Sequence, residues 1–254
     1  MDNEQIKDNF SKGAQTYDSH SDVQLVTAQK LIDFGPQIKP KKILEIGCGS
    51  GNYTLLLAKK YSDAKITAVD ISPDMIEIAT EKLKGQYAEF IVSDAEKIKL
   101  KERYDLITSN ATLHWFSEPA KALQSYKTAL DEKGIITFSY FGPLTFRELS
   151  DSIKTTMGED RLISAEKFLD KISLARMLDG IFSRVIIAES DIVAESSNLL
   201  DLLTKIKYTG TRGVGLNNPY LFGKDKLAKV ESAYLEKYGK IISTYQIFFC
   251  MVMP

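Results

Sequence analysis

The stretch Leu44-Glu-Ile-Gly-Cys-Gly-Ser-Gly-Asn52 decides the fold. It begins inside Lys42–Ile46, a short apolar run typical of a buried strand, and it ends where a helical pattern begins. Between strand and helix lie three alternating glycines, Gly47, Gly49 and Gly51. Glycine allows positive φ and close approach of a ligand to the backbone, so such a loop before a helix suits a nucleotide-like ligand. The triplet alone also fits a tight turn that binds nothing.

The residues around these glycines narrow the choice of ligand that the loop could bind. The spacing is G-x-G-x-G, preceded by the acidic Glu45, whereas dinucleotide-binding dehydrogenases use G-x-G-x-x-G. Asp70 closes the next strand-like run, where a carboxylate can accept hydrogen bonds from both ribose hydroxyls. Asp70 could instead cap the helix that starts at Pro73, but Ser72 suits that cap better. Asp94 closes a third run, where its side chain could meet an exocyclic amine.

Apolar runs and amphipathic stretches alternate along the chain, which predicts an α/β fold with a parallel sheet and helices on both faces. The predicted strands are residues 42–46, 65–69, 89–92, 104–108, 134–140, 182–188 and 245–252. The predicted helices are residues 22–34, 53–61, 73–83, 119–130, 145–156, 163–178, 196–207 and 224–238, and residues 209–223 are predicted to be a loop.

We interpret residues 1–254 as one domain with four parts. Residues 1–35 form an N-terminal lid and helix, 40–142 the cofactor-binding core, 143–240 the substrate-side helices with an insertion, and 243–254 the last strand.

Composition excludes several classes of protein. The 254 residues include 33 Lys and Arg against 34 Asp and Glu, a net charge of -1, so bulk attraction to nucleic acid is not indicated. No apolar run approaches the roughly 20 residues that span a bilayer, and the polar N-terminus lacks a signal-peptide pattern, which predicts a cytoplasmic protein without a membrane partner. Cys48 and Cys250 are not expected to pair, and with only His20 and His114 besides, no metal site is predicted.

Four runs of sequence together carry a resemblance to a known family. They are LEIGCGSGNYT (44–54), AVDIS (68–72), SDAE (93–96) and YDLITSNATLHWF (104–116). This set strongly resembles the S-adenosylmethionine-dependent methyltransferases with a Rossmann-like fold. The resemblance implies a class I methyltransferase with a seven-stranded, mainly parallel sheet whose last strand is antiparallel.

A narrower resemblance spans nearly the whole chain. The segments FSKGAQTYDSHSDVQ (10–24), FSYFGPLTFREL (138–149), LLTKIKYTG (202–210) and TYQIFF (244–249) are similar to the malonyl-acyl-carrier-protein O-methyltransferases of biotin synthesis. The run LHWF also occurs in methyltransferases that esterify small carboxylic acids. A methyltransferase for a small free acid or other metabolite, and a cofactor-binding module without catalysis, therefore remain alternatives.

The resemblance implies S-adenosylmethionine as cofactor, with S-adenosylhomocysteine as the product. The implied cofactor-binding residues are Glu45, Gly47, Gly49, Gly51, Asp70, Ile71, Met75, Asp94, Ala95 and Asn110. Among them, Asp70 takes the ribose, and Ile71 and Met75 flank the adenine. Asp94 with Ala95 meets the adenine amine, and Asn110 faces the methionine part.

The implied acceptor is the free carboxylate of a malonyl thioester on acyl-carrier protein, or on coenzyme A. A carboxylate with a pKa near ~4 is ionised at neutral pH and needs no general base, which agrees with the lack of a base–nucleophile pattern in the sequence. Arg147 is our first candidate to orient it, because a guanidinium grips a carboxylate with two hydrogen bonds. Lys205, Lys207 and Arg212 are rivals, and could also steer an acidic carrier protein.

Two further residues are catalytic candidates. Tyr17 lies in a polar leader that the resemblance implies closes over the site as a lid. His114 lies in the loop after the fourth strand, where it either contacts the reactants or simply packs beside Trp115.

Overall fold

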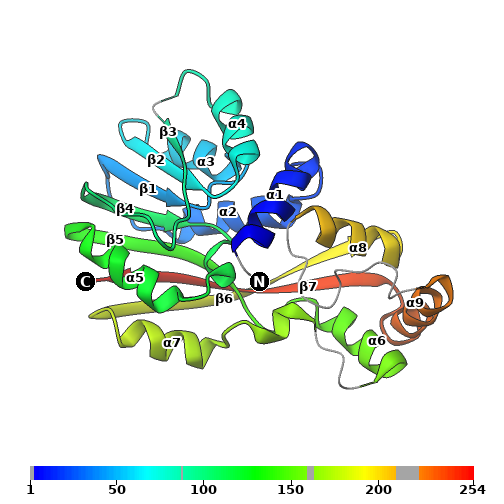
Figure 1. Ribbon diagram of the computed structural model, residues 1–254. Helices are drawn as coiled ribbons and strands as arrows, with labels where there is room; N and C mark the ends of the chain where they lie inside the picture. The colour runs from blue at the N-terminus through cyan, green and yellow to red at the C-terminus, as the bar shows by residue number, and fades with distance from the viewer. Residues whose placement is uncertain (1–2, 87, 159–162, 210–222) are drawn as a thin grey trace.

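A seven-stranded sheet forms the centre of the molecule (Figure 1). The computed structural model describes residues 3–86, 88–158, 163–209 and 223–254. The strands are β1 (Lys42–Ile46), β2 (Lys65–Asp70), β3 (Ala88–Val92), β4 (Tyr104–Ser109), β5 (Leu130–Phe141), β6 (Arg184–Ser196) and β7 (Ile241–Met253). They lie in the order β3-β2-β1-β4-β5-β7-β6. Pairing is parallel from β3 to β5, and β7 is antiparallel to both β5 and β6, which confirms the predicted fold class.

Helices cover both faces of the sheet. They are α1 (Asn3–Tyr17), α2 (Asp22–Phe34), α3 (Asn52–Lys60), α4 (Pro73–Lys82), α5 (Pro119–Thr128), α6 (Arg147–Met157), α7 (Lys171–Asp179), α8 (Leu199–Tyr208) and α9 (Lys224–Tyr238), with short 3₁₀ turns η1 (Leu113–Trp115) and η2 (Ser164–Lys167). Successive residues of a strand point to opposite faces. Ile43 accordingly packs into a core with α2, α3, α6, α8 and α9, while Leu44 packs into a second core with α5 and α7. No helix in the described part of the chain is long and apolar enough to cross a membrane.

Local sequence explains where the central elements begin and end. Ser72 caps α4 as predicted, since its hydroxyl accepts a hydrogen bond from Met75 N at 3.2 Å, and Pro73 occupies the first turn. Cys48 and Cys250 are both buried free thiols and are not joined to each other by a disulfide.

The leader forms helix α1, as expected for a helical N-terminal segment, and α1 contacts α4 and α8 (Figure 1). Other elements differ from the predicted ones. Strands β5 and β7 begin earlier than predicted, at Leu130 and Ile241. The strand predicted over 182–188 is longer, because β6 pairs with β7 along its whole length. The helix predicted over 163–178 is divided into η2 and α7, because Asp170 caps a new helix by accepting from Ser173 N at 2.7 Å. Most of the predicted loop 209–223 lies outside the described residues.

Candidate active site

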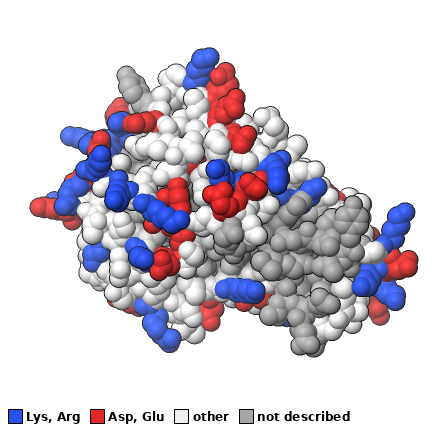
Figure 2. All heavy atoms as spheres, viewed as in Figure 1, with Lys and Arg blue, Asp and Glu red and all other residues white. Residues whose placement is uncertain are grey.

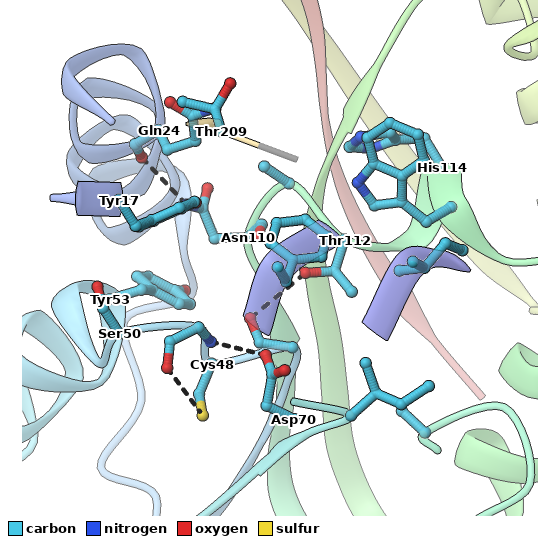
Figure 3. A pocket seen from close by; sticks show the side chains of 18 of the residues that line it. Tyr17, Gln24, Cys48, Ser50, Tyr53, Asp70, Asn110, Thr112, His114 and Thr209 are labelled. Atoms are coloured by element: carbon cyan, nitrogen blue, oxygen red, sulfur yellow. Dashed lines mark hydrogen bonds between the residues drawn. The ribbon is translucent and has the colours of Figure 1, made fainter. Parts of the chain in front are cut away.

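A cleft of roughly 1050 Å³, part of it open to solvent, lies at the carboxyl ends of β1, β2 and β4. This is the edge where open α/β sheets bind ligands. Residues of α1, α2, the loop after β1 and the loop after β4 line it together. Figure 3 shows Gln24 and Asn110 toward one end of the cleft and Asp70 toward the other.

The glycine loop, residues 47–51, forms the floor of the cleft. Gly47 and Gly49 have φ of 70° and 52°, in the left-handed region that glycine favours. A Cβ on Gly47 would lie 2.2 Å from Thr112 Oγ1, whereas a Cβ on Gly49 would meet no atom within 4 Å. The backbone at Gly49 therefore faces open space in which a ligand can approach closely.

Asp70 ends β2 directly beside this loop. Its two carboxylate oxygens each accept one backbone hydrogen bond, from Gly49 N at 2.8 Å and from Ser72 N at 2.9 Å. Burial raises the pKa of Asp70, and the backbone N–H groups of Ser72 and Gly49 oppose that rise. Because an ionised carboxylate offers about four acceptor positions, both oxygens can accept further bonds from a ligand in the cleft.

Ile71, Asp94 and Ala95 line the same end of the cleft. The Asp94 carboxylate accepts from Asn3 Nδ2 at 2.8 Å and pairs with Lys97 Nζ at 2.8 Å. Burial acts to raise the pKa of Asp94, but the hydrogen bonds from Lys97 and Asn3 outweigh it and the pKa is lowered. Asp94 is thus ionised at neutral pH and tied to the first turn of α1.

Three of the implied cofactor residues do not line the cleft. Gly51 precedes α3, where a Cβ would lie 2.8 Å from Leu83 Cδ1. Met75 is fully buried in α4. Glu45 is 1% exposed, and neither of its carboxylate oxygens makes a hydrogen bond of regular geometry to another described residue. The nearby Thr54 hydroxyl only partly opposes the effect of burial on its pKa. Burial raises the pKa of Glu45 to about 8, so the sealed carboxyl group is mostly protonated at neutral pH. Direct contact of these three with a cofactor stays a prediction.

Asn110 lines the cleft at the end of β4, and its side chain ties two elements together. Its Nδ2 donates to the carbonyl oxygen of Gln24 in α2 at 3.0 Å, and its Oδ1 accepts from Ser139 Oγ at 2.9 Å. Ser139 Oγ in turn accepts from Ala111 N at 2.8 Å. The amide of Asn110 thereby fixes α2 against the end of the sheet.

The end of α1 places Tyr17 in the cleft and Asp18 just outside it. Asp18 accepts hydrogen bonds from Ser50, from Asn52 Nδ2 at 3.0 Å and from Lys82 Nζ at 2.7 Å. Partial burial acts to raise the pKa of Asp18, but these hydrogen bonds, led by that from Lys82, lower it. This cluster joins the α1–α2 connection to the glycine loop and to α4.

Tyr17 and His114 both line the cleft, and neither is suited to act as a base. Burial, with smaller effects from the charges of Asp70 and Asp18, raises the pKa of the Tyr17 hydroxyl, so it stays protonated. Burial lowers the pKa of His114 to about 3, so its ring is neutral. Both ring nitrogens of His114 are buried without a hydrogen-bond partner among the described residues, and the ring lies 4.8 Å from that of Trp115, centre to centre.

The predicted cations lie away from this arrangement. No Lys or Arg of the described residues lines the cleft. Arg147 pairs with Asp191 at 3.0 Å and lies 3.5 Å from Glu148, so its role as a carboxylate clamp stays a prediction. Lys205 pairs with Asp201 at 3.1 Å.

The other two basic candidates are Lys207 and Arg212. Lys207 is exposed, with its ammonium 5.0 Å above the ring of Tyr208. Arg212 lies outside the described residues.

Sequence reasoning missed the contribution of α2 to the cleft. Gln24, Leu25 and Ala28 line it from one face of that helix, at the spacing of successive helical turns, and Ser21 lines it from the N-cap position. The available signal was a polar pair, Ser21 and Gln24, on the face that also carries buried Ala28. Without the position of α2 beside Asn110, that face could not be assigned to a cleft.

Comparisons with known proteins identify the family. Residues 39–195 match the family described as Methyltransferase domain. Malonyl-acyl-carrier-protein O-methyltransferase 1 of Ilyobacter polytropus is 34% identical, over 94% of this chain and 89% of that protein. The chain belongs to the malonyl-acyl-carrier-protein O-methyltransferase family.

Other members of this family match at similar extent. O-methyltransferase 2 of Ilyobacter polytropus is 33% identical over 94% of this chain and 92% of its own length. The Bacillus cereus member is 30% identical over 96% of this chain and 94% of its own length. These matches cover far more of the chain than residues 39–195.

Solved structures agree on the fold. The YcgJ protein of Bacillus subtilis has a TM-score of 0.63 at 13% identity, covering 90% of this chain and 98% of that one. Phosphoethanolamine N-methyltransferase 2 of Haemonchus contortus, solved with S-adenosylhomocysteine, has a TM-score of 0.60 at 15% identity, covering 98% of this chain and 60% of that one. This O-methyltransferase therefore has the class I methyltransferase fold.

Proposed function

We propose that this chain uses S-adenosylmethionine to methylate the free carboxylate of a malonyl group carried on acyl-carrier protein, the step that starts pimeloyl and biotin synthesis. The observation that carries the proposal is the similarity over 94% of the chain to a relative named for this reaction. The cleft supports it, because its cofactor end and its α2 end are built by different elements and can hold two reactants.

The described residues fit this cofactor. S-adenosylmethionine supplies a methyl group already activated on a sulfonium. Gly49 leaves open space above the backbone, and Asp70 keeps acceptor positions for ribose hydroxyls. Asp94 and Ala95 border the same end, where an adenine amine can be met. The carboxylates of Asp70, Asp94 and Glu96 give this end negative charge, which favours a cationic ligand.

The chain's own residues would act by position rather than by proton transfer. The acceptor carboxylate is ionised at neutral pH with a pKa near ~4, so no proton has to be removed. The protonated Tyr17 hydroxyl can donate a hydrogen bond in the cleft, and the neutral ring of His114 stiffens its wall. Holding two reactants in register is worth up to about 7–11 kcal/mol in favourable systems.

We propose that α1 is the lid that excludes water from this reaction. Three polar contacts support this role. Two are made by α1 itself, Asn3 with Asp94 and Ser11 Oγ with Ser72 Oγ at 2.9 Å, and the third, Asp18 with Lys82, directly follows it. Within α1 the fully buried residues are only Gly13 and Ala14. A helix held mainly by exchangeable polar contacts can open to admit substrate and close again.

Docking of an acidic carrier would depend on local positive charge. Figure 2 shows basic and acidic side chains interspersed on the described part of one face. The exposed Lys207 lies on α8, which leads to the cleft residue Thr209. We therefore place carrier recognition near the end of α8, where a salt-dependent KM would reveal it.

A transfer assay with labelled S-adenosylmethionine tests the proposal. Malonyl-carrier protein, malonyl-coenzyme A and free malonate are offered side by side at equal concentration. We expect base-labile label on the carrier protein at the highest kcat/KM. Label on a free acid with none on the carrier would refute the carrier-bound acceptor, and no label on any carboxylate would refute carboxyl methylation.

A further inference from the structure

The cleft lacks a cation where a carboxylate is expected. None of the described lining residues is Lys or Arg, and the three charged side chains among them are acidic. An anion removed from water requires hydrogen-bond donors if it is to bind at all. Among the described residues these donors must be neutral.

Besides the Tyr17 hydroxyl, Gln24 is a lining side chain that meets this requirement. It is 8% exposed in the first turns of α2, and it lines the cleft with Leu25 and Ala28. Its side-chain amide makes no hydrogen bond to another described residue, yet it is not among the polar groups sealed from the cleft. His114 differs on this point, because both of its ring nitrogens are sealed by the surrounding rings.

The position of Gln24 is fixed by its own backbone. Asn110 Nδ2 donates to the Gln24 carbonyl oxygen at 3.0 Å, and Ser139 Oγ donates to Asn110 Oδ1 at 2.9 Å (Figure 3 draws the first of these). The cleft-lining amides of Asn3, Asn52 and Asn110 thus all donate to other described residues. The amide of Gln24 is held in place and has no hydrogen-bond partner within the described part of the chain. A buried amide without a hydrogen-bond partner destabilises the folded protein, and a hydrogen bond to a ligand oxygen would remove that penalty.

A neutral donor also suits the reaction. When the acceptor carboxylate becomes an ester, its negative charge disappears. A cation paired with that carboxylate would stabilise the starting state more than the transition state and would slow the step. An amide N–H orients the oxygen with a smaller penalty as the charge is lost.

We propose that the side-chain amide of Gln24 donates a hydrogen bond to the carboxylate of the acceptor and orients it for methylation. The proposal rests on the proposed function, since it names a contact to that substrate. It differs from the clamp predicted for Arg147, which pairs with Asp191 outside the cleft.

Variants of Gln24 test this contact by steady-state kinetics on malonyl-carrier protein and by calorimetry with S-adenosylhomocysteine. Gln24→Leu removes the donor, and Gln24→Glu replaces it with a like charge. Both should lower kcat/KM by at least about tenfold, the loss expected for one hydrogen bond to a charged group, and Gln24→Glu should lower it further. The affinity of both variants for S-adenosylhomocysteine should stay within about twofold of that of the parent, because a contact to the acceptor alone does not alter the cofactor end of the cleft.

The matched control is Gln29→Leu. Gln29 is an exposed glutamine of the same helix whose Nε2 donates to Asp33 Oδ1 at 3.1 Å, so this variant should keep the kinetics of the parent. Parent-like kinetics in both Gln24 variants would overturn the proposal, as would equal losses of product affinity and turnover. A loss confined to Arg147→Ala would assign the contact to Arg147 instead.

The proposal and the proposed function fail differently. If the parent methylates a free acid and not malonyl-carrier protein, the function is wrong, and the same variants measured on that acid still test Gln24. If the parent methylates the carrier and the variants do too, only the Gln24 contact is wrong.

Discussion

Replacing Glu45 with glutamine should remove the pH dependence of stability that this group gives the parent between pH 4.5 and about 8. Glu45 is 1% exposed, its carboxylate makes no hydrogen bond of regular geometry to another described residue, and burial raises its pKa to about 8 from 4.5. Between these two values the native state holds a proton that the unfolded state has released. The contribution of Glu45 to the free energy of unfolding is therefore fully present below pH 4.5 and is lost as the pH rises through 8.

The size of the effect follows from the pKa difference. At about 1.36 kcal/mol per pKa unit, the free energy of unfolding of the parent should fall by up to about 5 kcal/mol relative to Glu45→Gln across this interval. The quantity to compare is the difference between the two proteins at each pH, because effects of all other groups then cancel. The cost of burying the glutamine amide does not depend on pH, so it does not affect how this difference changes with pH.

Urea unfolding followed by circular dichroism at about pH 5, 7 and 9 measures this difference. The exposed Glu236→Gln on α9 is the control and should reproduce the pH profile of the parent. A Glu45→Gln profile parallel to that of the parent would show that Glu45 is not a buried protonated acid, and the description of the layer beneath the glycine loop would be wrong.

Three further predictions concern the cofactor end, the lid and the aromatic wall. Asp70→Ala should weaken binding of S-adenosylhomocysteine by on the order of 2–4 kcal/mol, through two lost ribose hydrogen bonds; unchanged affinity in calorimetry would sink the ribose assignment. Removing residues 1–20 should leave the sheet folded by circular dichroism and abolish most turnover, whereas a folded truncation with full activity would show that α1 is no lid. His114→Phe should remove acid sensitivity between pH 6.5 and about 3, since an imidazole whose folded pKa is lowered loses stability as the pH falls; equal acid unfolding midpoints in variant and parent would contradict the sealed neutral ring.

Sequence reasoning succeeded where a local pattern determines the geometry. Gly47 and Gly49 follow a buried strand directly, so the loop and its positive φ angles depend on only a few neighbouring residues. Asp70 could be brought beside that loop because parallel neighbouring strands end at the same edge. Both inferences need only strand order and chain direction.

The sequence does not predict the surroundings of side chains that depend on tertiary packing. Glu45 adjoins the glycine loop in sequence, but the strand turns its side chain into a sealed layer. Arg147 looked available until β6 brought Asp191 within 3.0 Å of it from another part of the chain. Gln24 ends the segment 10–24 that carries the narrower resemblance, but no role could be assigned to it from that segment. Its place in the cleft wall and the contact of Asn110 with α2 show that it faces the cleft.

The most direct test of the central claim is the intact mass of the acyl-carrier protein after reaction. Malonyl-carrier protein is incubated with the enzyme and S-adenosylmethionine and is then examined by mass spectrometry, with fragments that separate the malonyl group from the polypeptide. We expect a gain of one methylene mass confined to the malonyl group, reversed by mild base. An unchanged malonyl group, or methylation of the polypeptide instead, would contradict it.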